Sequence, residues 1–183
     1  IVDIGGGTTE IAVMSLGGVV FSKSLRVAGD AMDLGIINYM RKKFNLLIGE
    51  STAEKIKKEI GTAIPTTNNV FLMKGRDIRT GTPKEISLTE EDACEALMPI
   101  LSQMLAAIKE ALESTPPELS ADLVDMGLVL TGGGALLKNI DKLISKDTGL
   151  PVTIADNPLE CVALGTGKAL ENEELFSTML SEY

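Results

Sequence analysis

The chain of 183 residues contains no histidine and no tryptophan. Without histidine, catalysis of the Ser-His-Asp or Cys-His type is excluded, and most transition-metal sites lose their usual ligand. Carboxylates, lysines and hydroxyls remain for chemistry, together with an oxygen-bound cation such as Mg²⁺. Aromatic residues make up only 3% of the chain, so single-stranded nucleic acid has few rings on which to stack its bases.

Cysteine is also scarce, and long apolar runs are missing. Cys94 and Cys161 are far apart and show no CxxC spacing, so a disulfide framework or a zinc site has no support; we expect two reduced thiols in the core. No apolar run reaches the roughly 18 residues that span a bilayer, and no leader-like segment opens the chain. The net charge of −9 argues against a nucleic-acid partner.

The hydrophobic patterns predict an α/β fold. Leu16-Gly17-Gly18 is typical of a hairpin turn between two early strands, and the last elements form a βαβα run, which implies parallel pairing. We expect a mixed sheet in βββαβαβα order with helices on both faces. The predicted strands are 1–4, 10–15, 19–27, 70–74, 123–131 and 151–155, and the predicted helices are 30–44, 52–60, 89–114, 135–145 and 158–170.

Local signals predict where some helices begin or bend. Asp30 is a candidate N-cap of helix 30–44, and Ser51-Thr52-Ala53-Glu54 reads as a capping box. Pro99 should kink helix 89–114 or mark its restart. Residues 46–88 differ in composition from the rest of the chain and contain many turn-forming residues. We expect them to form a small inserted α+β lobe. The core would then comprise residues 1–45 and 89–183.

Two glycine triplets, more than a hundred residues apart, are the most informative motifs. Each directly follows a short apolar strand: Asp3-Ile4-Gly5-Gly6-Gly7-Thr8-Thr9-Glu10 and Leu130-Thr131-Gly132-Gly133-Gly134-Ala135. A backbone without Cβ atoms can approach a phosphate closely and aim its N–H groups at the anion. The alternatives are a glycine hairpin and a plain helix entry, which need fewer glycines. Two such loops could hold one nucleotide from two sides.

These motifs, in this order, resemble the second half of the actin-like ATPases, whose ribonuclease H-like fold is shared by actin, sugar kinases and one class of heat-shock chaperones. The first loop is similar to their second phosphate loop, and the second is similar to their adenosine loop. The chain most resembles the MreB family of bacterial actin homologues, which shape rod-like cells. The similar stretches are 28–30, 36–39, 47–50, 116–119 and 162–170. The two parts named above correspond to subdomains IIA (core) and IIB (lobe).

The resemblance implies a site for ATP and Mg²⁺. The phosphate contacts would come from the backbone amides of the first loop and one hydroxyl, namely Gly5, Gly6, Gly7 and Thr8. Asp3 would meet the cation or its water shell, because a hard cation that bridges phosphates prefers carboxylate oxygen. An isolated Asp at a strand end is more often a turn residue, so this role depends on the resemblance.

The same resemblance implies contacts to the nucleoside. The second loop would pass beside the ribose and the α-phosphate with Gly132, Gly133, Gly134, Ala135 and Leu136. From the lobe, Glu54 and Lys57 would reach the adenine and the ribose, with Lys58 as a weaker candidate. A solvated charged face explains these three equally well.

In this superfamily the first phosphate loop and the catalytic group belong to the other domain. The chain also opens inside a strand without an initiator Met, so we expect the front of a longer protein to be missing. We therefore expect no catalytic residue here and ATPase activity only in the full-length protein.

The implied function is the nucleotide-binding half of an ATPase that polymerises head to tail into cytoskeletal filaments and controls rod cell shape. The resemblance places it in the cytoplasm, at the inner face of the membrane, with membrane proteins of morphogenesis as partners. The alternatives are a phosphotransferase of the sugar or acetate kinase type and a chaperone-type ATPase.

Overall fold

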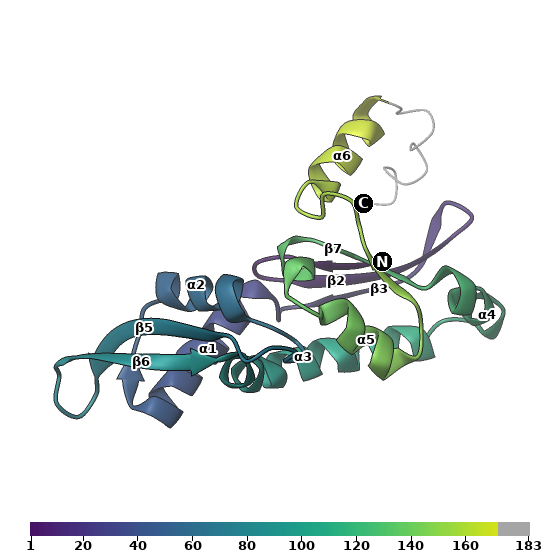
Figure 1. Ribbon diagram of the computed structural model, residues 1–183. Helices are drawn as coiled ribbons and strands as arrows, with labels where there is room; N and C mark the ends of the chain where they lie inside the picture. The colour runs from purple at the N-terminus through teal and green to yellow at the C-terminus, as the bar shows by residue number, and fades with distance from the viewer. Residues whose placement is uncertain (172–183) are drawn as a thin grey trace.

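A five-stranded mixed sheet forms the centre of the protein (Figure 1). The computed structural model describes residues 1–171. The strand order is β3-β2-β1-β7-β8, with β1 Val2–Ile4, β2 Thr9–Ser15, β3 Gly18–Leu25, β7 Leu128–Thr131 and β8 Val152–Ile154. β1, β2 and β3 pair antiparallel, whereas β1 with β7 and β7 with β8 pair parallel. The predicted mixed α/β sheet is confirmed.

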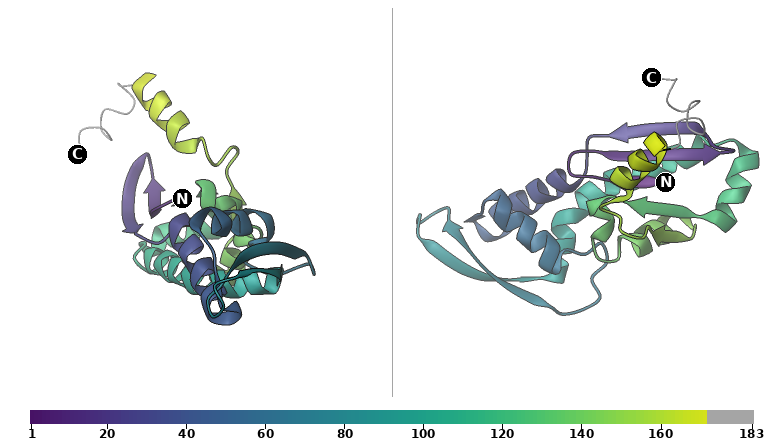
Figure 2. Two further views of the ribbon diagram at one scale, coloured as in Figure 1. Left: turned by 90° about the vertical axis from the view of Figure 1, so that its left-hand side faces the viewer. Right: turned by 90° about the horizontal axis from the view of Figure 1, so that it is seen from above.

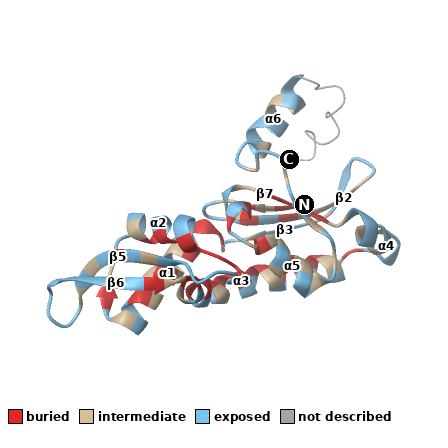
Figure 3. Cartoon of the chain, viewed as in Figure 1, coloured by how far each residue is buried: buried red, intermediate tan, exposed pale blue. Residues whose placement is uncertain are grey.

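One face of this sheet is covered by helices. Alternate residues such as Val2, Ile4 and Ile11 are buried beneath α3 Glu90–Glu113 and α5 Ile140–Thr148, and α1 Gly29–Phe44 packs against α3. On the opposite side lies only α6 Cys161–Glu171, which stands away from the sheet and has no buried residue (Figures 1, 2 and 3). Helices thus lie on both sides, but in the described residues they pack on one face.

Helix α3 is the main support of the core. Its buried stripe includes Leu97, Leu101, Met104 and Ile108, and each such side chain contributes about 2 kcal/mol by leaving water. The helix is continuous through Pro99, so the predicted restart at this residue is wrong. Pro99 is exposed, so the backbone bond it removes lies on the solvent side while the buried stripe holds the helix together. No helix among residues 1–171 is both long and apolar enough to cross a membrane.

Residues 46–88 contain a second, antiparallel sheet of order β4-β5-β6 and one helix. The elements are β4 Leu46–Leu47, α2 Glu50–Ile60, β5 Val70–Asp77 and β6 Pro83–Thr89. The sequence predicted only one strand followed by turns, because Gly75 and Pro83 read as breakers. Gly75 is needed, since a Cβ there would lie 2.7 Å from the Leu47 carbonyl oxygen, and Pro83 is the first residue of an edge strand.

Two predicted helix starts were wrong. Helix α1 has Ala28 at its N-cap and α2 has Gly49, neither with a side-chain cap. Asp30 instead lies within the first turn, where its charge favours the helix dipole. The capping box occurs at α3, where Thr89 and Asp92 bond each other's backbone N–H groups.

The region before the second glycine loop also differs from the prediction. The first four residues of the expected strand 123–131 belong to helix α4 Pro117–Met126, which ends at Gly127 with a φ of 70°. Only Leu128–Thr131 is strand. The expected helix 135–145 is a 3₁₀ turn, η1 Gly133–Leu136, followed by α5 from Ile140.

The two cysteines have different surroundings. Cys94 is buried on α3, and burial raises the pKa of its thiol. Cys161 is partly exposed at the start of α6, so the expectation of a core thiol was wrong there. Because α6 does not pack on the sheet, its first residue has no core to enter.

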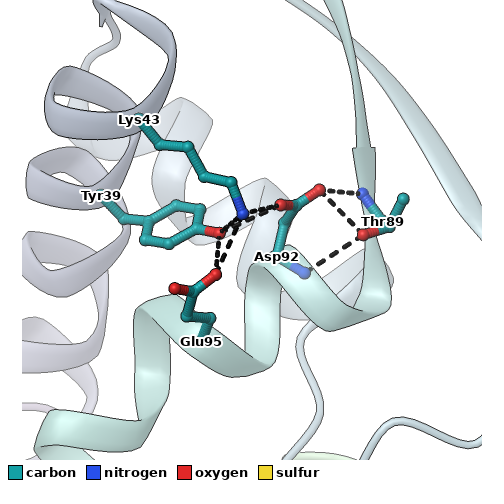
Figure 4. A network of polar contacts seen from close by, with 5 residues as sticks. All are labelled: Tyr39, Lys43, Thr89, Asp92 and Glu95. Carbon is teal, nitrogen blue, oxygen red and sulfur yellow. Dashed lines mark hydrogen bonds and ion pairs between the residues drawn. The ribbon is translucent and has the colours of Figure 1, made fainter.

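A polar network joins α1 to α3 (Figure 4). The Lys43 ammonium donates to Asp92 Oδ1 at 2.8 Å and to Glu95 Oε2 at 3.0 Å. The Tyr39 hydroxyl lies within hydrogen-bond distance of the same two oxygens and can donate its single proton to either. The other Asp92 oxygen accepts from the Thr89 backbone and hydroxyl. Burial alone would raise the pKa of Asp92, but these bonds outweigh it and lower the pKa to about 2.

We expect Asp92→Ala to lower the free energy of unfolding by about 2 kcal/mol at neutral pH, because it removes the Asp92 side of the capping box and an ion pair together. The folded pKa is depressed, so the contribution is present above the unfolded pKa near 4 and is lost as the pH falls towards 2. Urea unfolding of the wild type and of Asp92→Ala between pH 7 and pH 2.5 measures this. A stability difference that stays constant across that range would contradict the assignment.

Candidate functional site: two glycine loops at one end of the sheet

The two glycine loops lie side by side. β1 and β7 are neighbouring parallel strands, with Val2 opposite Leu130 and Asp3 opposite Thr131, so the loops that follow them leave the same end of the sheet. They also touch: a Cβ on Gly132 would overlap the Ile4 carbonyl oxygen, and one on Gly134 would overlap the Ile4 side chain. Segments far apart in the sequence therefore form one surface, as the motifs predicted.

The first loop is held by the start of α1. Within the loop, the Gly5 N–H donates to the Thr8 carbonyl at 2.9 Å. The Gly29 and Asp30 N–H groups donate to the carbonyls of Gly5 and Gly6 at 3.1 and 2.8 Å. The carbonyls thus point at α1, while the N–H groups of Gly6 and Gly7 make no hydrogen bond within the described residues. The Thr8 side chain is exposed beside them.

The second loop is built on a strained backbone. Gly132 has φ 81° and ψ 171°, a conformation that is essentially restricted to glycine. Its N–H donates to the Pro158 carbonyl at 2.9 Å, which fixes the turn. Gly133 then opens η1, so its N–H has no partner within that helix and its Cα is exposed. Ala135 is fully buried, and Leu136 is exposed.

Three carboxylates lie near the first loop. Asp3 is directly opposite Glu10 on the face of the sheet that the helices leave open, and burial, with the Glu10 charge second, raises the pKa of Asp3. The exposed Asp30 carboxylate lies beside the loop, 3.6 Å from the position of a Cβ on Gly6. Within residues 1–171, no group of three or more Cys, Asp or Glu side chains could hold a metal ion by itself.

The three residues of α2 that were predicted to contact the nucleoside, Glu54, Lys57 and Lys58, have different surroundings. The Lys57 ammonium lies at the root of the first loop, 3.0 Å from the Gly29 carbonyl oxygen and 2.8 Å from Asp33 Oδ2. Glu54 and Lys58 instead pair with each other at 2.6 Å on the exposed side of the helix. The structure therefore brings Lys57 to the loops, and it gives Glu54 and Lys58 no contact with either loop.

Other polar residues at this end were missed by the sequence reading. Asp33 binds Lys57, and the Lys138–Asn139 pair joins the end of α2 to the segment after the second loop. The Ala63 N–H donates to the Lys138 carbonyl at 2.8 Å, and Asn139 Nδ2 donates to the Ile64 carbonyl at 2.9 Å. Only one of these residues carries a sequence signal: Asp33 lies one turn after Asp30, off the apolar stripe of its helix.

The mixed sheet with two glycine loops at one end defines an actin-like nucleotide-binding fold. A family model described as MreB/Mbl protein matches residues 1–178, and the chain belongs to this family. The cell shape-determining protein MreB of Escherichia coli K12 is 51% identical over 172 residues, which cover 93% of this chain and 50% of that protein. Mbl of Bacillus cereus is 51% identical over 173 residues, covering 94% of this chain and 52% of its own length.

Solved structures agree with this assignment. MreB 5 of Spiroplasma citri bound to AMPPNP matches with a TM-score of 0.91 and 40% identity, covering 94% of this chain and 52% of that one. The MamK double helical filament matches with a TM-score of 0.72 at 22% identity, over 86% of this chain and 49% of that chain, which shows the shared fold alone. The chain spans about half the length of the curated relatives that it matches.

Proposed function

We propose that this chain is the nucleotide-binding half of an MreB-type ATPase that forms cytoskeletal filaments. The single observation that carries the proposal is the pair of glycine loops on adjacent parallel strands, with the N–H groups of Gly6, Gly7 and Gly133 left without partners in the described residues. The related MreB 5 was solved with AMPPNP and with ADP, which supports a nucleotide as the ligand.

The first loop fits the phosphates of ATP together with Mg²⁺. The amides of Gly6 and Gly7 and the Thr8 hydroxyl would bind the β- and γ-phosphates. The Gly5 N–H, which the sequence also suggested as a phosphate donor, bonds the Thr8 carbonyl instead and shapes the turn. Asp3 and Asp30 place negative charge beside that anion site, which would repel a bare triphosphate. A bound Mg²⁺ would neutralise charge on the phosphates, and Asp3 would hold it directly or through its water shell.

The second loop and α2 fit the nucleoside. The backbone of Gly132 to Gly134 would pass beside the ribose and α-phosphate, with the exposed Leu136 side chain nearby. Ala135 would act through its backbone and its packing, because its side chain is fully buried. Lys57 would reach the ribose from the root of the first loop, whereas Glu54 and Lys58 would first have to break their mutual ion pair.

We propose that hydrolysis requires a second domain on the other side of the nucleotide. By resemblance, the other phosphate loop and the water-positioning group come from another domain, and the relatives are about twice as long as this chain. Apolar side chains that such a domain would cover are exposed on α6: Val162, Leu164 and Leu170. We therefore propose that ATP is hydrolysed only when both domains are present, because the phosphate contacts of one domain alone give little transition-state stabilisation.

The two ends of the molecule suit head-to-tail assembly. The β5–β6 hairpin lies at one end and α4 at the other (Figures 1 and 2). The hairpin region exposes Val70, Leu72 and Ile78, while a cavity of about 280 Å³ between α3, α4 and the sheet is lined largely by apolar residues. Contacts between unlike ends produce open filaments, and MamK of this fold forms one.

By family resemblance we further propose that the filaments lie at the inner face of the cell membrane and contact membrane proteins of morphogenesis. A sugar or acetate kinase and a chaperone ATPase share the loops but not the MreB/Mbl match over residues 1–178. The family match therefore favours the filament function over both.

Sedimentation of the full-length protein tests this function. We expect Mg·ATP to move most of the protein into the pellet, and omission of Mg²⁺ or ATP to leave most of it in the supernatant. The reason is that bound nucleotide would favour closure of the two domains around it and hence the contacts between subunits. Gly133→Val, with ATP present, should behave like the sample without ATP. Pelleting that is independent of nucleotide, or phosphate transfer from ATP to a sugar, would contradict the proposal.

A further inference from the structure

Lys57 is tied to the first glycine loop through a chain of close contacts. Its ammonium donates to the Gly29 carbonyl oxygen at 3.0 Å, and the Gly29 N–H donates to the Gly5 carbonyl at 3.1 Å. The lysine is mostly buried, with 18% of its side chain exposed, and its partner Asp33 is 15% exposed. A charged side chain of α2 is therefore held at the root of the loop and not left in solvent.

The carboxylate that holds Lys57 is only half satisfied. Asp33 Oδ2 accepts from Lys57, but Oδ1 is buried and has no hydrogen-bond partner in the described residues. Burial raises the pKa of Asp33, and the bond and charge of Lys57 act against that rise. A buried carboxylate oxygen without a partner is unfavourable, so an ion pair that served stability alone would be expected to satisfy both oxygens.

Helix α2 is bonded to the segments that flank both glycine loops. In its last turn, Lys57 bonds the Gly29 carbonyl at the root of the first loop, and beyond its end Thr62 and Ala63 are bonded to Lys138 and Asn139, which follow the second loop. The Lys138 ammonium also donates to the Glu59 carbonyl. A lysine on this helix is thus placed with respect to both loops at once.

We propose that Asp33 is a positioning residue that orients the Lys57 ammonium for the nucleoside end of the bound nucleotide. This inference rests on the proposed function, in which Lys57 reaches the ribose. Asp33 removes the freedom of a long side chain before the ligand arrives, so less conformational entropy is lost on binding. Its effect should appear in the affinity for ATP and not in the affinity for phosphates alone.

Calorimetry of the full-length protein with two probes tests this role. The probes are ATP and inorganic tripolyphosphate, each with Mg²⁺, and the variants are Asp33→Asn, Lys57→Met and the double variant. We expect Asp33→Asn to weaken ATP binding about tenfold, the loss typical of one charge-assisted hydrogen bond, and to change tripolyphosphate binding less than about twofold. The double variant should be no weaker than Lys57→Met, since Asp33 acts through Lys57.

Asp147→Asn is the matched control, because Asp147 pairs with Lys109 at 2.9 Å away from both loops. It should leave both affinities unchanged. Equal losses for ATP and tripolyphosphate in Asp33→Asn, or additive losses in the double variant, would overturn the proposal. If circular dichroism shows that Asp33→Asn is unfolded, Lys57→Met decides: unchanged ATP affinity there also overturns it. A wild type that binds neither probe would instead reject the proposed nucleotide site itself.

Discussion

Replacing Gly6 or Gly133 by valine is expected to weaken Mg·ATP binding by about a hundredfold, the loss of two charge-assisted hydrogen bonds, while the fold stays intact. Both positions are open in the protein: a Cβ on Gly6 would meet only Asp30, at 3.6 Å, and one on Gly133 only the end of Leu159, at 3.2 Å. Leu159 is 70% exposed and free to move aside. The added side chain would therefore project into open space at the proposed site and not into the core.

The binding of a fluorescent ATP analogue to the full-length variants measures this effect, with urea unfolding run in parallel. Gly18→Val is the matched control, because Gly18 lies at the far end of β2 and β3, in the 15–18 hairpin, and a Cβ there meets nothing closer than 3.7 Å. It should bind like the wild type. Wild-type affinity in both Gly6→Val and Gly133→Val would remove both loops from the site.

Gly132→Ala should have the largest effect on stability, lowering the free energy of unfolding by about 3 kcal/mol or more. Its φ of 81° with a ψ of 171° is unsuitable for a residue with a Cβ, and that Cβ would overlap Asp3 Oδ1 and the Ile4 carbonyl oxygen. The second loop could not keep its place against β1 without moving the backbone. Urea unfolding monitored by circular dichroism gives the free energy directly.

Gly149→Ala is the comparison that separates two costs of Gly132→Ala: the strain of a positive φ in alanine and the overlap of the new Cβ with its neighbours. Gly149 also has a positive φ, 75°, but nothing lies within 4 Å of a Cβ built there. We expect a cost of only about 1 kcal/mol at this site. If Gly132→Ala costs no more than Gly149→Ala, the close approach of the second loop to β1 is not a structural requirement.

The sequence alone was sufficient for the general fold and for the meeting of the two loops. Each glycine triplet directly follows an apolar run, and the βαβα order at the end of the chain implies parallel strands. That β1 is the parallel neighbour of β7 did not follow from this order; the convergence of the loops was predicted from the paired glycine motifs and the family resemblance. The hairpin at Leu16-Gly17-Gly18 was also predictable, because a tight turn needs positive φ values and the sequence offers glycine there. In the structure Leu16 and Gly17 adopt them.

What the sequence could not predict depends on tertiary contacts. Strand β6 was missed because Pro83 and Gly75 look like breakers until a partner strand and the packing of Leu46 and Leu47 are known. The last four residues of helix α4 were predicted as strand because the helix has no buried residue, so its apolar residues do not mark a core-facing stripe.

The candidate site shows the same division. Glycine loops carry their signal locally, but the role of a charged side chain depends on its partner. Lys57 and Lys58 are adjacent and chemically alike, yet one lies at the loop and the other is exposed on α2. The difference arises from Asp33, which is contributed by another helix and whose pairing with Lys57 is not visible in the sequence.

A nuclear magnetic resonance titration of the ¹⁵N-labelled chain with Mg·ATP tests most directly whether one nucleotide is held by both loops. We expect the amide signals of residues 5–7 and 132–134 to shift together along a single binding curve, because one ligand would contact both loops. The hairpin at residues 15–18, at the far end of the sheet, should not respond. Shifts confined to one loop, or two curves with different midpoints, would contradict a shared site.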